Sequence, residues 1–406
     1  MLLIYNIGIK IYHFIAIIAS LVNTKAKLWV NGRRAQKVTA LPKSIWFHFA
    51  SLGEFEQGRP VLEAVKAQYP DHKIVITFFS PSGYEIRKNT PLADAVYYLP
   101  IDTAQNAQQF INTVKPAAAI FTKYEYWYHY FNELHKQQIP LYVISAIFRP
   151  KQIFFKWYGS LHRSILTKVT RFFVQDEASQ KLLANIGINN VQVSGDTRFD
   201  RVYANAQQPK ALPVIEEFKN NQPTFIAGST WPADEELLVS LVERYPDWKF
   251  IFAPHEIPED KIGKLMALLP AGKAVRFSQI PTLSTPLLTY QVLVIDNIGM
   301  LSSLYQYGDV AYIGGGFGVG IHNTLEAAAF GLPVIFGPNY SRFKEARDLV
   351  ALKAGYSISN AEQLAEIAEK LIKDAGYRHT ASDVARQFVV ESKGATELIM
   401  RNMVIL

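Results

Sequence analysis

The sequence predicts an α/β protein with two doubly wound parallel sheets that follow one another along the chain. From residue 43 onward, short apolar runs alternate with segments of helical periodicity. A polar stretch that contains prolines interrupts this alternation near residue 205, and the alternation then starts again. Strands buried on both faces are typical of parallel sheets, and their alternation with helices is typical of doubly wound folds.

The first predicted sheet takes its strands from short apolar runs at 45–50, 74–79, 95–99, 117–121, 141–144, 172–174 and 191–193. Segments between them, such as 57–68 and 104–114, have the spacing of amphipathic helices. The stretch 200–213 is polar and contains two prolines, a composition that predicts a linker between domains.

The second predicted sheet takes its strands from runs at 224–227, 250–253, 292–296, 310–313 and 334–336. Two Rossmann-like halves that face one another across a cleft form the plan called GT-B, which is therefore the predicted fold. The predicted divisions are an N-terminal membrane-associated helix with a basic segment, two Rossmann-like domains, and a C-terminal helix that packs back on the first domain: 1–35, 36–205, 206–380 and 381–406.

The composition limits the available chemistry. The chain has 406 residues, 49% of them hydrophobic, which is enough for two domains with sizeable cores. It contains no cysteine, which excludes disulfides, a thiol nucleophile and cysteine-ligated metals. The net charge of +7 favours a phosphorylated substrate or an anionic membrane surface, although solubility alone is an alternative reason. No nucleic-acid partner is predicted, because the sequence has no zinc finger, RNP motif or long Lys/Arg run.

The first residues predict a membrane-associated helix. The segment 2–22 is almost wholly apolar, and a helix of ~20 residues is long enough to cross a bilayer. Lys10 near its middle would cost about 2.5–3.5 kcal/mol there, so a helix that lies in the interface is an equal alternative. A buried core helix of a soluble enzyme is the third alternative. The basic residues that follow favour the cytoplasmic side: Lys25, Lys27, Arg33 and Arg34.

The first candidate for catalysis lies just after the first predicted strand, where the sequence reads Ser-Leu-Gly-Glu at 51–54. Ser51 and Gly53 predict a tight turn into a helix, and Glu54 falls at the start of that helix. The carboxyl ends of parallel strands border the ligand crevice, so Glu54 is placed to take a proton from an acceptor hydroxyl. Partial burial would raise its pKa toward this task. The alternative is that Glu54 only complements the positive end of the helix.

The second candidate is the glycine-rich segment 314–320, which is followed by His-Asn-Thr-Leu-Glu at 322–326. Glycines let backbone N–H groups approach an anion, and a following helix adds positive potential. Glu326 is placed to bind the two hydroxyls of a ribose. A glycine-rich loop alone is a weak signal, but this combination is typical of nucleotide-sugar enzymes. A loop that is merely tight is the alternative.

Other polar residues follow further predicted strands. Ser229 and Thr230 are placed either to bind a phosphate or to cap a helix. His255 is placed either to polarise a leaving phosphate or to serve as a structural histidine, and 296–299 borders the same predicted cleft. In the first half, Glu125 stands among aromatic residues, a setting that suits sugar recognition and a plain core equally well.

In this order the motifs resemble the family of Kdo transferases, which add 3-deoxy-D-manno-octulosonic acid (Kdo) to lipid A precursors in lipopolysaccharide assembly. The similarity runs over nearly the whole chain. It includes the apolar first helix together with Ser-x-Gly-Glu at 51–54, Glu-x-Trp at 125–127, Gly-Asp-x-x-Phe-Asp at 195–200, Ser-Thr at 229–230 and His-Asn-x-Leu-Glu at 322–326.

The resemblance implies an inverting glycosyltransferase at the cytoplasmic face of the inner membrane, with CMP-Kdo as donor and a tetra-acylated lipid A precursor (lipid IVA) as acceptor. Glu54 would be the general base. The domain 36–205 would bind the acceptor or the Kdo sugar through Ser51, Gly53, Glu125 and Arg149. The domain 206–380 would bind CMP through Ser229, Thr230, His255, Gly315, Gly316, Asn323 and Glu326.

The chain departs from the family pattern at three places. Where the family often has Pro-Arg-His-Pro, this chain has Ala-Pro-His-Glu at 253–256, which leaves open the group that supports the donor phosphate. Where many members have Asn-Ala-Arg-Leu-Ser, this chain has Ser-Ala-Ile-Phe-Arg at 145–149, and Arg149 is the candidate to supply the charge. The usual Glu-Leu-Trp-Pro is Glu-Tyr-Trp-Tyr at 125–128. The proposed base and nucleotide-binding residues remain, so activity is expected.

Neither a metal nor an organic cofactor is predicted, because no cluster of metal ligands stands out and the leaving phosphate carries a single link to sugar. Two other functions remain open. One is a GT-B enzyme for a UDP-sugar, either a lipid-linked N-acetylglucosamine transferase or a sugar epimerase, although an epimerase has no need of the apolar first helix. The other is a non-catalytic, membrane-tethered nucleotide-binding module, against which the retained Glu54 argues.

Overall fold

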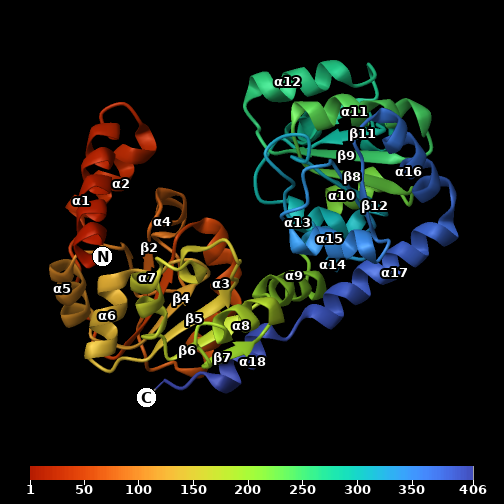
Figure 1. The fold of residues 1–406 in the computed structure, drawn as a ribbon. Helices are drawn as coiled ribbons and strands as arrows, with labels where there is room; N and C mark the ends of the chain where they lie inside the picture. Colours follow the sequence, from red (N-terminus) through yellow and green to blue (C-terminus); the bar gives the residue numbers. More distant parts are fainter. Residues whose placement is uncertain (406) are drawn as a thin grey trace. The chain divides into compact units, whose positions relative to one another are not determined.

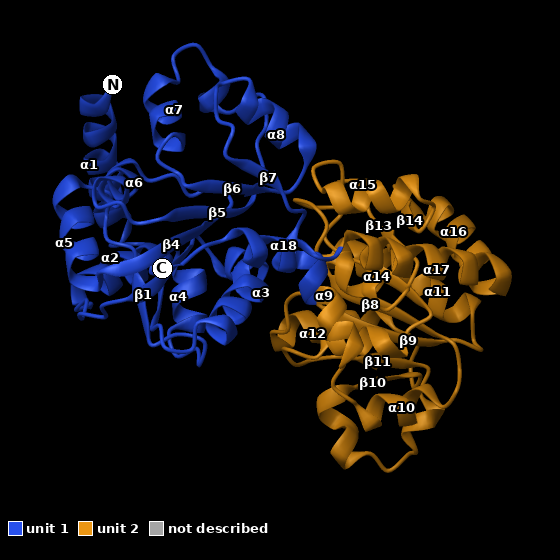
Figure 2. Ribbon diagram, turned by 90° about the horizontal axis from the view of Figure 1, so that it is seen from below, with its two compact units in different colours: residues 1–201, 393–406 blue, residues 202–392 orange. Residues whose placement is uncertain are grey.

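The computed structural model describes residues 1–405 and contains two compact units (Figure 2). Unit 1 comprises residues 1–201 and 393–406, and unit 2 comprises residues 202–392. Each unit contains a seven-stranded parallel sheet with flanking helices, which confirms the predicted fold class (Figure 1).

The sheet of unit 1 has the strand order β3-β2-β1-β4-β5-β6-β7. The chain moves outward from β1 to β3 and then returns to the other side of β1 with β4. The carboxyl ends of β1 and β4 therefore meet at the point where the order reverses, which is where open α/β sheets bind ligands. The strands are β1 Ser44–Phe49, β2 Ile74–Phe78, β3 Ala95–Tyr98, β4 Pro116–Thr122, β5 Leu141–Ala146, β6 Arg171–Val174 and β7 Val191–Val193.

Residues along β1 alternate between two apolar cores, one on each face of this sheet. Trp46 packs with one cluster, whereas Ile45, Phe47 and Phe49 pack with the other. The helices that cover the sheet are α1 Leu2–Ala19, α2 Thr24–Ala35, α3 Leu52–Gln68, α4 Pro81–Arg87, α5 Ala104–Val114, α6 Tyr128–Lys136, η1 Ile153–Phe155, α7 Ser160–Leu166, α8 Glu177–Ala184 and α18 Ala395–Asn402.

The sheet of unit 2 has the order β10-β11-β9-β8-β12-β13-β14, with its reversal between β8 and β12. Its strands are β8 Thr224–Thr230, β9 Lys249–Pro254, β10 Ala274–Arg276, β11 Val292–Val294, β12 Val310–Ile313, β13 Val334–Phe336 and β14 Gly355–Ser357. The helices are α10 Pro213–Lys219, α11 Pro232–Arg244, α12 Glu259–Leu268, η2 Phe277–Thr282, η3 Leu287–Thr289, α13 Leu301–Leu304, η4 Tyr305–Tyr307, α14 Leu325–Ala329, α15 Lys344–Ala351, α16 Ala361–Lys373 and α17 Ala375–Ser392.

The segment predicted as a linker is largely helical. Helix α9 extends over Thr197–Gln207, so the first half of the predicted linker at 200–213 is helical. Phe199 and Val202 are buried three positions apart, and this helical spacing of apolar residues outweighs the polar composition around them. The division between the two units falls within this helix.

The chain returns to unit 1 near its end. Ile399 and Met403 belong to the same apolar cluster as the inward residues of β1. Asp200 accepts hydrogen bonds from the backbone N–H groups of Gly394 (2.5 Å) and Thr396 (2.7 Å). The segment expected to pack back as one piece, 381–406, is therefore divided: α17 lies in unit 2 up to residue 392, and α18 lies on unit 1.

Helix α1 is long and apolar enough to cross a membrane. None of its residues is buried, which excludes the alternative of a buried core helix. One face contacts unit 1, where the Tyr5 hydroxyl donates to Asp102 (2.5 Å) and Asn6 Oδ1 lies 2.7 Å from His129 Nε2. The opposite face exposes an apolar stripe at helical spacing: Leu3, Ile4, Ile7, Ile11, Phe14, Ile15 and Ile18.

Candidate active site

Glu54 is the third residue of α3, immediately beyond β1. One oxygen, Oε2, accepts a hydrogen bond from the backbone N–H of Ala50 (2.6 Å), as acidic residues in a first helical turn often do. Burial raises the pKa of Glu54 to about 7, although the Ala50 bond opposes this rise. The nearby Glu125 raises the pKa further and Lys123 lowers it. A carboxyl group with a pKa near neutrality is suited to general base catalysis. Glu54 therefore both complements the start of the helix and is suited to act as a base.

The turn before α3 differs from the one predicted. Ser51 is the N-cap in an extended conformation, and its side chain makes no capping hydrogen bond. Gly53 lies inside the helix, and a β-carbon added there would meet nothing nearer than the Ser51 Oγ at 4.0 Å. Gly53 therefore belongs to the helix and not to the predicted turn, and packing does not require glycine there. The missing side chain instead leaves open space at the start of the helix that carries Glu54.

Glu125 follows β4, which is hydrogen-bonded to β1 in the sheet. The loops that carry Glu54 and Glu125 therefore lie next to one another at the reversal point of the strand order. The Oε2 atom of Glu125 accepts a hydrogen bond from the indole N–H of Trp127 (3.0 Å) and lies 3.3 Å from His48 Nε2. These two partners fix the orientation of the carboxylate.

His48 was not among the predicted site residues, although it is fully buried on β1. Its Nδ1 lies 2.8 Å from the hydroxyl oxygen of Thr77, which also accepts from the indole N–H of Trp46 (2.8 Å). We assign the hydroxyl proton of Thr77 to His48 Nδ1 and the ring proton to Nε2, which then donates to Glu125. A signal was available: His48 and Thr77 are polar residues opposite one another in otherwise apolar strands.

Asp196, in the Gly-Asp-x-x-Phe-Asp motif, is tied to the helix that carries Glu54. It is buried and accepts hydrogen bonds from Gln57 of α3 (2.8 Å) and from Arg198 Nε (2.9 Å). Burial raises the pKa of Asp196, but the charge and hydrogen bonds of Arg198, together with the charge of Lys123, lower it by more, so that the pKa lies below its usual value. Arg149, by contrast, lies exposed in the loop after β5.

In unit 2, the glycine-rich loop follows β12. A β-carbon on Gly314 would lie 2.2 Å from the Ser229 carbonyl oxygen, and one on Gly316 would lie 2.6 Å from the Cα of Gly337. Gly315 has a φ of +90°, and its N–H donates to Asp234 (2.9 Å). Close packing of the loop against neighbouring strand ends therefore requires these glycines. The N–H of Gly315 is engaged within the protein, contrary to the expectation that it faces an anion.

The residues after this loop lie as the motif predicts, next to one another. Asn323 accepts a hydrogen bond from the Leu325 N–H (3.1 Å) and donates to Glu326 Oε1 (3.0 Å). The helix that follows, α14, has five residues, so its contribution to the potential at the loop is smaller than expected.

Ser229 and Thr230 end β8, and neither caps a helix, because the N-cap of α11 is Trp231. The Thr230 hydroxyl donates to Glu235 (2.9 Å) and is therefore engaged within unit 2. Ser229 has a φ of +53°, which is rare for a residue other than glycine. Strain of this kind often occurs at ligand sites.

His255 stacks against two other rings. Its ring centroid lies 4.9 Å from that of Trp231 and 4.3 Å from that of His322. The indole N–H of Trp231 donates to His322 Nε2 (3.1 Å), so the ring proton of a neutral His322 is on Nδ1. Burial and the nearby His255 lower the pKa of His322, which favours this neutral form.

Asp234 was not predicted from the sequence, yet it connects the loops of this site. It is buried in the first turn of α11 and accepts three hydrogen bonds. The donors are the backbone N–H groups of Gly315 (2.9 Å) and Trp231 (2.9 Å) and the hydroxyl of Tyr312 (2.7 Å). Over residues 1–405, no group of three or more histidines or carboxylates is placed to hold a metal ion.

Solved structures with this arrangement confirm the class of fold. The UDP-GlcNAc 2-epimerase from Neisseria meningitidis aligns with a TM-score of 0.62 and 14% identity over 88% of this chain and 98% of that protein. A glycosyltransferase from Rickettsia africae aligns with a TM-score of 0.55 and 12% identity over 89% and 97% of the two chains. The protein therefore has the GT-B fold.

Sequence comparisons show which family within this class the chain is similar to. The 3-deoxy-D-manno-octulosonic-acid transferase (kdotransferase) family profile matches residues 24–201. The 3-deoxy-D-manno-octulosonic acid transferase of Haemophilus influenzae is 28% identical over 88% of this chain and 86% of its own length. The enzyme of the same name from Aquifex aeolicus is 26% identical over 79% and 84%. The chain is therefore similar in sequence to the Kdo transferases, and the resemblance seen in its motifs is confirmed.

Proposed function

We propose that this protein is an inverting glycosyltransferase that moves Kdo from CMP-Kdo to the lipid A precursor lipid IVA. The observation that carries this proposal is Glu54, a largely buried carboxyl group with a pKa of about 7 at the reversal point of the first sheet. Homology to the Kdo transferases supports the choice of donor and acceptor.

In the proposed reaction, Glu54 takes the proton of an acceptor sugar hydroxyl while the oxygen of that hydroxyl attacks the anomeric carbon of Kdo. The bond from this carbon to the phosphate oxygen breaks, and CMP leaves as a phosphate monoester. Attack from the side opposite the phosphate inverts the anomeric centre. The Ala50 N–H holds Oε2 of Glu54, so Oε1 is the oxygen offered to the acceptor.

Residues near Glu54 are proposed to bind the sugars. His48 and Trp127 both contact one oxygen of Glu125, so the other oxygen is offered to sugar hydroxyls. The open space at Gly53 and the N-cap Ser51 give the acceptor access to the base.

Residues of unit 2 are proposed to hold CMP. Asn323 and Glu326, which bond to each other, are assigned to the ribose. Ser229 is a better candidate than Thr230 for the donor phosphate, because the Thr230 hydroxyl is engaged by Glu235. His255 and His322 are assigned to the same phosphate. They would take the place of the arginine that the family often has before this histidine and that this chain lacks. The tight loop at Gly315 and Gly316 is proposed to shape the wall of the CMP site.

Helix α1 is proposed to lie in the interface of the inner membrane, at its cytoplasmic face. The exposed apolar stripe, with Ile4, Ile7 and Ile11 at its centre, supports membrane contact. The hydrogen bond of Tyr5 to Asp102 holds the opposite face on unit 1, which favours a helix lying on the membrane over a separate span.

Mass spectrometry of lipid IVA after incubation with the protein and CMP-Kdo tests the proposed function. The expected result is a product heavier by Kdo. An unchanged acceptor, together with turnover of a UDP-sugar, would instead support the UDP-sugar enzymes. Thermal unfolding gives a second readout: CMP is expected to raise the unfolding temperature more than UDP, and the reverse order would contradict the assigned donor.

A further inference from the structure

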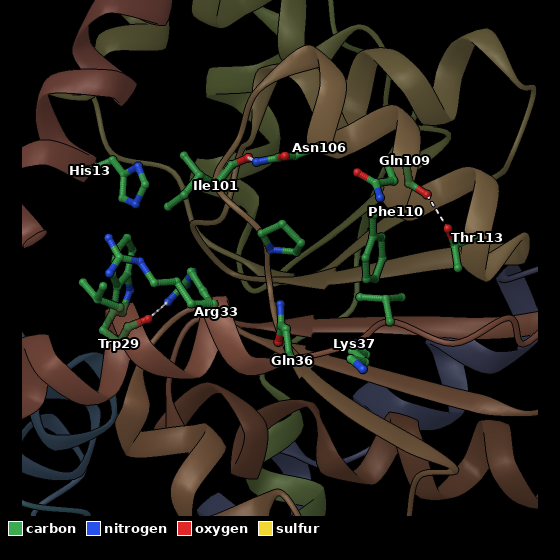
Figure 3. Close-up of a pocket in the computed structure, with 14 residues that line it drawn as sticks. His13, Trp29, Arg33, Gln36, Lys37, Ile101, Asn106, Gln109, Phe110 and Thr113 are labelled. Atoms are coloured by element: carbon green, nitrogen blue, oxygen red, sulfur yellow. Dashed lines mark hydrogen bonds between the residues drawn. The ribbon is translucent and has the colours of Figure 1, made fainter.

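A cavity of about 500 Å³ lies in unit 1, and neither Glu54 nor Glu125 is among its lining residues (Figure 3). Its walls come from α1, α2 and α5, together with the segments that follow α2 and β3. Figure 3 shows His13 and Arg33 on one side and Gln109, Phe110 and Thr113 of α5 on the other.

The cavity is cationic. Arg33, Arg34 and Lys37 contribute positive charge to its wall, and the lining within the described chain includes no aspartate or glutamate. Burial lowers the pKa of His13, and the positive charges of Arg34 and Arg33 lower it further. This effect of the two arginines shows that the electrostatic potential at the cavity wall is positive. An anion in this cavity would therefore meet attraction from several sides.

Arg33 is a charged group that is mostly withdrawn from water, and it has no carboxylate partner within residues 1–405. Its guanidinium donates to the carbonyl oxygens of Leu99 (2.8 Å) and Phe79 (2.8 Å) and lies 3.8 Å from the centroid of the Trp29 ring. Among residues 1–405, its hydrogen-bond partners are backbone carbonyl oxygens. Burial lowers the pKa of Arg33 to about 9, yet the group stays charged near neutral pH. Buried charges are usually paired, so an anion here would supply the missing counter-charge.

The cavity also has an apolar wall, to which Val38, Ile101 and Phe110 contribute. It borders α1, whose outer face is the exposed apolar stripe. A phosphate attached to an apolar chain matches this combination of a cationic wall, an apolar wall and a membrane-contacting helix. A soluble anion would use the charge but not the apolar surfaces.

We propose that this cavity binds the phosphate of an anionic membrane phospholipid, with the phosphate at Arg33, Arg34 and Lys37 and the glycerol part against Ile101. The lipid is not the acceptor of the glycosyl transfer. Its binding seats unit 1 on the membrane surface and gives that contact a preference for anionic lipids.

Flotation with vesicles of phosphatidylcholine, with or without phosphatidylglycerol, tests the site on the full chain. The double variant Arg34→Gln/Lys37→Gln is expected to bind phosphatidylglycerol vesicles about thirty-fold more weakly, or ~2 kcal/mol, since each basic residue at a membrane contributes about 1 kcal/mol. The control Lys136→Gln/Lys181→Gln removes the same charge at exposed positions of unit 1 and is expected to bind as the wild type does. Equal weakening by both variants would overturn the proposal, because only net charge would then matter.

A variant that fills the cavity without changing the charge separates a pocket from a charged surface. Gln109 is exposed on α5, and Gln109→Trp places a large side chain into the opening. Calorimetry with soluble dihexanoyl phosphatidylglycerol is expected to show binding to the wild type and none to Gln109→Trp. Retained binding by Gln109→Trp, with an unchanged unfolding midpoint, would refute the pocket.

The source of the phosphate is decided by two further probes. Inorganic phosphate is expected to bind more weakly than dihexanoyl phosphatidylglycerol, and equal affinity would point to a free anion instead of a lipid. The Arg34→Gln/Lys37→Gln variant is expected to keep its KM for detergent-solubilised lipid IVA. A raised KM with unchanged vesicle binding would assign the cavity to the acceptor and contradict the proposal.

Discussion

Replacing Glu54 by glutamine is expected to stabilise the protein at alkaline pH. The native structure holds this carboxyl group largely buried, at the reversal point of the first sheet. Among residues 1–405 its one hydrogen-bond donor is the Ala50 N–H, and a glutamine oxygen can accept the same bond. The substitution therefore removes the charge while keeping the shape and this contact.

The size of the effect follows from the pKa of Glu54, which burial raises from 4.5 to about 7. Each pKa unit corresponds to about 1.36 kcal/mol, so the whole difference is about 3 kcal/mol. Because the folded-state pKa is the higher one, this stability is fully present below pH 4.5 and is lost as the pH rises through about 7. Relative to Glu54→Gln, the wild type is therefore expected to lose about 3 kcal/mol of unfolding free energy between acidic and alkaline pH.

Urea unfolding of both proteins across this pH range measures the difference. Glu177→Gln is a suitable control, because it removes a carboxylate that is 77% exposed from the same unit. The control is expected to follow the wild type at every pH. If Glu54→Gln and the wild type show the same pH dependence, Glu54 does not have a raised pKa, and its assignment as a base with a pKa of about 7 is refuted.

Three further predictions concern unit 2 and the reaction. Asp234→Ala leaves three donors without their acceptor and is expected to destabilise unit 2 by about 3 kcal/mol in urea unfolding; an unchanged midpoint would contradict this. Gly316→Ala forces a β-carbon to within 2.6 Å of Gly337 and is expected to weaken CMP binding in calorimetry, whereas Gly318→Ala, with 3.6 Å of clearance, is expected to bind CMP normally. Treatment with EDTA is expected to leave the rate of Kdo transfer unchanged, and a rate restored by added magnesium would show that the reaction needs a metal.

Much of the fold can be predicted because most of its strands are buried on both faces. Runs such as β12 and β13 are apolar throughout, which makes them visible in the sequence. The edge strands β10 and β14 escape prediction, because their three residues, Ala-Val-Arg and Gly-Tyr-Ser, are not apolar throughout, unlike those of the equally short β13. Helix α9 escapes because its buried Phe199 and Val202 stand among polar residues.

The candidate site is predictable where position along the chain decides the role. Glu54 and Glu125 directly follow strands, and a carboxylate at the end of a parallel strand faces the ligand edge. His48 and Asp234 are different, because their roles depend on distant partners. His48 meets a carboxylate 77 positions away, and Asp234 meets Gly315 81 positions away. Spacing along the sequence contains no sign of such pairs.

The turnover of Glu54→Gln with CMP-Kdo and lipid IVA tests most directly whether Glu54 is the base. Loss of a general base is expected to lower kcat by about 10²–10⁴-fold at a pH above 7, with CMP affinity unchanged. Near-normal turnover by this variant would contradict the assignment of Glu54 as the base.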